Sequence, residues 1–100
     1  MKVQRDLTEL IELLHQQLPA LAEQYRVRSL GVFGSYVRHE QRSDSDVDVL
    51  VTFDEPPSLL QFIELEQKLT DALGVKVDLV MRDGLKPTIG QRILSEVVSV

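Results

Sequence analysis

The 100-residue chain is 43% hydrophobic and 27% charged, which predicts one compact globular domain over residues 1–100 and excludes disordered and fibrous classes. Its formal net charge of −5 opposes binding to nucleic acid or anionic membrane, because both depend on a basic patch, so we expect neither as a direct partner. The sequence contains no cysteine, which excludes a disulfide framework and a thiolate metal site.

Apolar residues recur at helical spacing near the start of the chain and predict an amphipathic helix over residues 6–24. Asp6 and Glu9 are placed as a variant of the capping box that begins a helix. Pro19 lies inside the pattern and should kink or interrupt the helix near its last turn. The expected buried face consists of Leu7, Leu10, Ile11, Leu14, Leu18 and Leu21.

Two strands are predicted next, at residues 27–33 and at about 46–53, because both segments are rich in strand-forming residues. The first strand ends at Gly34, and we expect a brief helix from Ser35. The second strand stops before Pro56, because proline cannot donate to the hydrogen-bond ladder of a sheet.

A second long helix is predicted between Ser58 and Gly74. Ser58 and Gln61 have the spacing of a capping box, and Gly74 suits the left-handed residue that closes a helix. The buried stripe of this helix is expected to be Phe62, Leu65, Leu69, Ala72 and Leu73.

A third strand is predicted over residues 75–81, and a last helix from Thr88, after Pro87, to about Glu96. Residues 97–100 are expected to form a short edge strand or a docking tail. This order of elements predicts an α/β (α+β) fold, with a small mixed sheet flanked by helices. Alternation divides the third strand into one face with Val75, Val77 and Leu79 and another with Lys76, Asp78 and Val80.

The small size of the domain is compatible with a homo- or hetero-oligomer. A chain of this length buries only about 65% of its unfolded surface, so a partner subunit would add useful burial. No apolar stretch approaches the roughly 18 residues of a membrane helix, and the first residues lack the apolar core of a signal peptide. We therefore expect a cytoplasmic location and no membrane partner.

The chemistry is carried by Gly34-Ser35 and Asp46-Val47-Asp48, which ten residues separate. Asp46 and Asp48 are two residues apart at the start of a strand, so their side chains point the same way. Two like charges aimed at one spot repel, and a cation should therefore lie between them. Ligands that are all oxygen favour Mg²⁺, which usually takes one or two carboxylates together with nucleotide phosphates.

Asp78 is expected to join Asp46 and Asp48. One helix joins the second strand to the third, and such a unit usually returns parallel and adjacent, so Asp78 can stand beside the pair. Three carboxylates can hold two metal ions for an in-line displacement at phosphorus, and the third can bridge them or accept the proton of the incoming hydroxyl. Without metal, their repulsion should raise at least one pKa.

The glycine turn suits the phosphates of a nucleoside triphosphate. Gly34 lets the backbone turn tightly, and Ser35 with the free amides of the helix that follows can hold the terminal phosphates. Arg38, one turn later, can neutralise more of that charge.

Structural interpretations compete with this one. An isolated Asp-x-Asp pair is usually part of a solvated loop, the third-strand aspartate could protect a sheet edge, and Gly-Ser alone means only a turn. Asp44, Asp46 and Asp48 with Glu55 also match the acidic positions of an EF-hand calcium loop. That match fails because Val49 stands where the loop needs glycine, within a β-forming run.

Gly34-Ser35, ten residues and Asp46-x-Asp48 resemble the signature of the DNA polymerase beta-like nucleotidyltransferases, and nearly the whole chain looks like their minimal nucleotidyltransferase (MNT) branch. The resemblance implies the nucleotidyltransferase fold, with Gly34 and Ser35 on the triphosphate of ATP. It implies that Asp46 and Asp48 bind Mg²⁺ and that Asp78 completes the triad as base. Members of this branch are commonly paired with a HEPN-domain ribonuclease toxin. Such MNT antitoxins are implied to transfer AMP from ATP onto a tyrosine of the toxin.

Two positions depart from the family pattern: Val37 replaces the usual alanine, and His39 replaces the usual glycine. Glycine would suit a left-handed residue closing the short helix, a conformation that histidine adopts only at some cost. No proposed ligand is lost. Larger family members carry domains that bind the acceptor, so here we expect the acceptor on a partner or on a small exposed face.

Function hypotheses of different classes follow. The favoured one is a Mg²⁺-dependent adenylyltransferase that acts on a HEPN-domain toxin as its antitoxin. The second is a binding module that neutralises the same partner by masking its active site, without catalysis. Nucleotide transfer to a small molecule is weaker, because the chain has no second domain to bind one.

Overall fold

Three helices, four strands and two short 3-10 helices make up the part of the chain that the computed structural model describes, residues 6–42 and 44–100. In chain order they are α1 (Leu7–Tyr25), β1 (Val27–Phe33), η1 (Gly34–Tyr36), β2 (Val47–Phe53), α2 (Leu59–Leu73), β3 (Val77–Met81), η2 (Arg82–Gly84), α3 (Pro87–Glu96) and β4 (Val98–Ser99).

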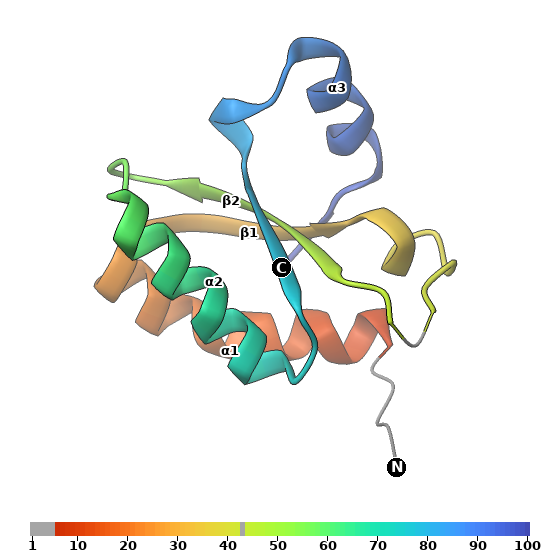
Figure 1. The fold of residues 1–100 in the computed structure, drawn as a ribbon, viewed down its shortest axis with the longest axis horizontal. Helices are drawn as coiled ribbons and strands as arrows, with labels where there is room; N and C mark the ends of the chain where they lie inside the picture. Colours follow the sequence, from red (N-terminus) through yellow and green to blue (C-terminus); the bar gives the residue numbers. More distant parts are fainter. Residues whose placement is uncertain (1–5, 43) are drawn as a thin grey trace.

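The four strands form one mixed sheet in the order β3-β2-β1-β4. The central pair β1 and β2 is antiparallel, β4 is antiparallel to β1, and β3 is parallel to β2. Helices α1 and α2 cover one face of the sheet, and α3 lies on the opposite side (Figure 1). This is the mixed sheet flanked by helices that the sequence predicts.

The main core lies between the sheet and the pair α1 and α2. Alternation along β2 places Val47, Val49 and Val51 in this core, so Asp48 and Leu50 belong to the opposite face. On that opposite face a smaller cluster packs α3 against the sheet. The fully buried side chains of the main core are Leu10, Leu14, Leu21, Val27, Val32, Val47, Val49, Val51, Leu65, Leu69, Leu73 and Val77, and the smaller cluster is Phe33, Leu50 and Ile93.

Helix α1 continues through Pro19, so the expected interruption is wrong. Proline removes one backbone donor from the helix, but Leu14 and Leu21 on either side of it are fully buried against the core. Packing of this face therefore holds the helix together across the missing hydrogen bond. At its start, the Asp6 carboxylate accepts from the Glu9 amide at 2.8 Å, as the capping pattern predicts.

Helix α2 has the predicted ends. Ser58 and Gln61 exchange the two hydrogen bonds of a capping box, at 3.1 and 3.0 Å, and Gly74 closes the helix with φ +69°. The third strand begins at Val77, two residues later than expected. Strand β4 confirms the edge-strand alternative for residues 97–100, since Val98 pairs with Val32 of β1. In the described residues, no helix is long and apolar enough to cross a membrane.

Candidate active site

Asp48 and Asp78 lie directly opposite each other at the start of two neighbouring strands. The parallel register of β2 and β3 pairs Asp48 with Asp78, and each is the second residue of its strand. Their neighbours Val47, Val49 and Val77 are buried beneath the sheet, so both carboxylates point to the face that α3 shares. Asp46 lies one residue before β2 and is exposed.

The pKa of the Asp48 carboxyl reflects its burial and the charges of the neighbouring carboxylates. Burial, followed by the charges of Asp78 and Asp46, raises the pKa of the Asp48 carboxyl above its ordinary value, and Arg38 opposes this shift. Both effects disfavour the charged form. The expectation that at least one of the three carboxyls has a raised pKa is thus confirmed at Asp48.

Asp46, Asp48 and Asp78 are not arranged as a complete metal-binding site. Across residues 6–42 and 44–100, no group of three or more histidine or acidic side chains stands close enough to hold a metal ion. The donor set nevertheless fits Mg²⁺, which prefers oxygen ligands, keeps several waters and is usually bound through only one or two carboxylates. Asp48 with its neighbours Asp46 and Asp78 would supply those carboxylates, and the ion would offset their repulsion.

Gly34 forms a tight turn against Asp48. Its φ is +82°, and a Cβ built on Gly34 would lie 2.1 Å from the Asp48 Oδ2 atom. Only glycine satisfies both the left-handed backbone and the lack of space. The structure therefore brings the predicted phosphate turn into contact with the predicted metal-binding carboxylate. Ser35 follows directly and is half-buried.

The loop from η1 to β2 is shaped by a buried tyrosine and a left-handed histidine. The hydroxyl of Tyr36 donates to the Ser45 carbonyl at 3.5 Å, and burial raises the pKa of Tyr36. Its ring belongs to the main core, which assigns Tyr36 to packing. His39 has φ +57°, so this position does adopt the left-handed backbone that we expected from the resemblance to the family pattern.

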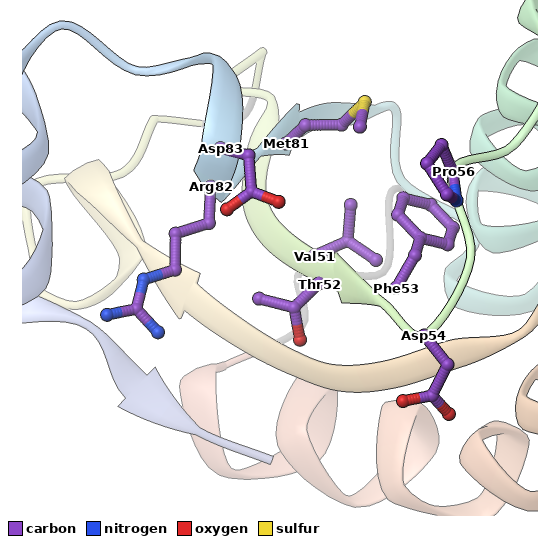
Figure 2. A pocket seen from close by; sticks show the side chains of 8 residues that line it. All are labelled: Val51, Thr52, Phe53, Asp54, Pro56, Met81, Arg82 and Asp83. Carbon is purple, nitrogen blue, oxygen red and sulfur yellow. The ribbon is translucent and has the colours of Figure 1, made fainter.

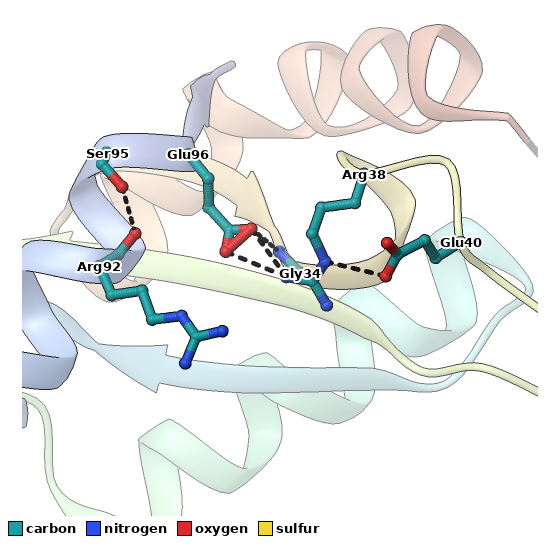
Figure 3. A network of polar contacts seen from close by, with 6 residues as sticks. All are labelled: Gly34, Arg38, Glu40, Arg92, Ser95 and Glu96. Carbon is teal, nitrogen blue, oxygen red and sulfur yellow. Dashed lines mark hydrogen bonds and ion pairs between the residues drawn. The ribbon is translucent and has the colours of Figure 1, made fainter.

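Arg38 meets a partner that the sequence reasoning missed, the carboxylate of Glu96 at the end of α3. The Arg38 Nη1 atom lies 2.9 Å from Glu96 Oε2, and its Nε atom donates to Glu40 at 3.1 Å. The same Glu96 oxygen accepts from the Gly34 amide at 3.3 Å. Figure 3 shows the Glu96 carboxylate facing both the Gly34 backbone and the Arg38 guanidinium.

The pairing of β4 with β1 explains why Glu96 reaches Gly34. Because Val98 pairs with Val32 in antiparallel strands, continuing the register by two residues sets Glu96 beside Gly34. The sequence does suggest an edge strand after Glu96, but not which strand it joins.

Two hollows lie at the opposite end of the sheet from the carboxylates. One is lined by the ends of β2 and β3, including Thr52, Arg82 and Asp83 (Figure 2). The other lies between the sheet and the last residues of the chain, including Leu94 and Val100. None of the predicted site residues lines either hollow.

Comparison with known proteins identifies the family. The nucleotidyltransferase domain family matches residues 14–100, so the chain belongs to that family. The protein adenylyltransferase MntA of Thermococcus cleftensis is 53% identical over 94 residues, covering 94% of this chain and 95% of the relative. A solved minimal nucleotidyltransferase matches with a TM-score of 0.80 and 35% identity, covering 97% and 98% of the two chains.

Two further solved structures are toxin–antitoxin complexes. One contains AMP-PNP and matches with a TM-score of 0.69 and 26% identity over 84% of this chain and 69% of the other. The second holds a tri-AMPylated HEPN toxin with an MNT antitoxin from Shewanella oneidensis, with a TM-score of 0.60 and 25% identity over 92% and 66%. These likenesses confirm the α+β nucleotidyltransferase fold.

Proposed function

We propose that this protein is a Mg²⁺-dependent adenylyltransferase that transfers AMP from ATP to a tyrosine hydroxyl of a HEPN-type ribonuclease toxin, and so acts as the antitoxin. The observation that carries the proposal is the register that sets Asp48 beside Asp78, with Gly34 packed on Asp48. The relative that shares 53% of its residues is named a protein adenylyltransferase. The two toxin–antitoxin complexes carry a nucleotide analogue and an AMPylated toxin.

Each part of the site has a role in this reaction. Gly34, Ser35 and Arg38 hold the triphosphate, and bound Mg²⁺ on Asp46, Asp48 and Asp78 supplies charge stabilisation at phosphorus. The tyrosine oxygen attacks the α-phosphorus, the bond to the β-phosphate oxygen breaks, and pyrophosphate leaves. The tyrosine proton passes to Asp78, which is exposed to solvent and can release it afterwards.

Incubation with Mg²⁺, ATP and the cognate toxin tests the proposal. The toxin should gain the mass of AMP on a tyrosine, as read by mass spectrometry, and Asp46→Ala or Asp48→Ala should abolish the gain. Asp44→Ala is the matched control, because Asp44 is an exposed residue of the same loop to which we assign no ligand. An unmodified toxin after exhaustive incubation with the wild-type protein would contradict the proposal.

A masking role without catalysis is the second candidate. It is favoured by an exposed apolar group at the start of α2, made of Leu59, Leu60 and Ile63, since such groups commonly mark protein-binding surfaces. An Asp46→Asn/Asp48→Asn double variant separates the two. If it neutralises the toxin as well as the wild type does, masking is sufficient. If neutralisation is lost while the complex still forms, transfer is required.

A further inference from the structure

The carboxylate of Glu96 occupies the two donors that a bound triphosphate needs. It accepts from the Gly34 amide at 3.3 Å and from Arg38 Nη1 at 2.9 and 3.1 Å. Carboxylate and phosphate oxygens are both anionic acceptors for backbone amides and guanidinium groups. We propose that Glu96 is a built-in substitute for a phosphate group, which fills the cradle in the nucleotide-free protein and must be displaced by ATP.

The backbone that carries Glu96 is fixed, so displacement concerns the side chain. Ile93 of the same helix is buried against the sheet, and the Val97 amide continues the helical bonding to Ile93 at 2.9 Å. Val97 packs closely on Gly31: a Cβ added to Gly31 would lie 2.6 Å from the Cγ2 atom of Val97. The Glu96 side chain is 21% exposed, which gives it a path into solvent when a stronger anion arrives.

Occupation of the cradle lowers the apparent affinity for nucleotide. A ligand that binds only the open arrangement has its apparent dissociation constant raised by the reciprocal of the open fraction. The inference rests on the proposed function, because it concerns the same phosphate site, and it adds a control on nucleotide entry. The Gly34 contact is longer than the Arg38 contact, so we expect it to be exchanged first.

Glu96→Gln tests the inference while keeping the shape of the side chain. We expect the dissociation constant for a Mg²⁺ complex of a non-hydrolysable ATP analogue to fall roughly tenfold, as measured by calorimetry on the full chain. Adenosine has no phosphate, so its affinity should not change. In steady-state transfer assays, the KM for ATP should fall while kcat changes little.

Glu40→Gln is the matched control. Glu40 contacts the same guanidinium through Nε, but it is 65% exposed and does not reach the Gly34 amide. Glu40→Gln removes the same amount of charge as Glu96→Gln. It therefore measures how much the loss of any nearby carboxylate changes the affinity for nucleotide. A much smaller change in affinity is expected for Glu40→Gln than for Glu96→Gln.

Nuclear magnetic resonance of the Gly34 amide reports whether the analogue displaces Glu96 from this donor. Its proton signal should shift in Glu96→Gln without nucleotide, and in the wild type only when the analogue is added. Equal affinities of the wild type and Glu96→Gln would overturn the inference alone, as would weaker binding by Glu96→Gln or an equal gain in Glu40→Gln. Absence of binding by every variant would overturn the proposed function with it.

Discussion

The backbone of Gly34 lies directly against the carboxylate of Asp48, with space for a hydrogen atom but not for a methyl group. The two residues come from η1 and β2, which the long loop after Tyr36 separates in sequence. This contact joins the predicted phosphate turn to the carboxylate pair, and it explains why the residue before Ser35 must be glycine.

Gly34→Ala should therefore damage both stability and transfer. Its left-handed φ of +82° costs a non-glycine residue about 1–3 kcal/mol of unfolding free energy, and the new methyl group forces the Asp48 carboxylate away. Urea denaturation and the transfer assay measure the two effects. Gly84→Ala is the control, since a Cβ there meets no atom within 4 Å. A Gly34→Ala protein with wild-type stability would contradict the fold of this turn.

Asp48→Asn should stabilise the metal-free protein at neutral pH. Because burial and the neighbouring charges of Asp78 and Asp46 raise the pKa of Asp48 in the folded state, the ionised carboxyl costs stability above that pKa. As pH falls through the folded pKa, the wild type binds its proton before the unfolded chain does and regains stability. The advantage of Asp48→Asn should thus shrink toward acid pH.

Thermal denaturation in a chelator across a pH series checks this expectation. Asp44→Asn serves as the control, because Asp44 is exposed in the loop before β2. Added Mg²⁺ should remove the advantage of Asp48→Asn, since the ion stabilises the charged carboxylates of the wild type. An Asp48→Asn protein less stable than the wild type at neutral pH would show that the carboxylate is not under strain.

Local patterns were sufficient to predict much of this fold. The capping pairs at Asp6 and Ser58, the left-handed Gly74 and the alternation along β2 each depend on residues close in sequence, so they could be read without tertiary information. Pro19 could not, because burial of the helix face outweighs the lost hydrogen bond. In this case packing, which is not visible in a local pattern, decided the outcome.

In the candidate site, too, one contact could be predicted from the sequence and another could not. The helix crossover between β2 and β3 predicts that Asp78 returns beside Asp48, and the register confirms this pairing. The contact of Glu96 with Gly34 depends on a two-residue strand finding β1 from the other end of the chain. Such pairings over long sequence separations leave no periodic signal, which is why Glu96 was missed.

His39→Gly should stabilise the protein. The histidine holds φ +57°, and relief of this left-handed strain, reduced by the greater entropy of glycine in the unfolded chain, should give about 0.5 kcal/mol. Chemical denaturation measures the gain. Glu55→Gly is the control, because Glu55 is an exposed residue outside the helices and strands that does not have a positive φ and should only lose stability. A His39→Gly protein less stable than the wild type would show that the imidazole makes a contact that outweighs the strain.

Side chains of α2 close the outer edge of β3, the strand that carries Asp78. The Val77 amide donates to the Thr70 hydroxyl at 3.0 Å, and the Leu79 amide donates to Glu66 at 2.9 Å. The edge-guard interpretation of Asp78 is thereby weakened, because α2 already covers the amides on either side of it.

Thr70→Val should leave the Val77 amide without its partner and cost about 1 kcal/mol of unfolding free energy. We also expect slower AMP transfer, because a looser β3 no longer fixes Asp78 opposite Asp48. Thr52→Val is the matched control, since the Thr52 hydroxyl contacts only the Ser29 hydroxyl among the hydrogen bonds described and leaves no backbone amide unpaired. Hydrogen exchange at Val77 reports the loosening directly. If Thr70→Val exchanges at the wild-type rate and transfers AMP normally, the edge closure does not position Asp78.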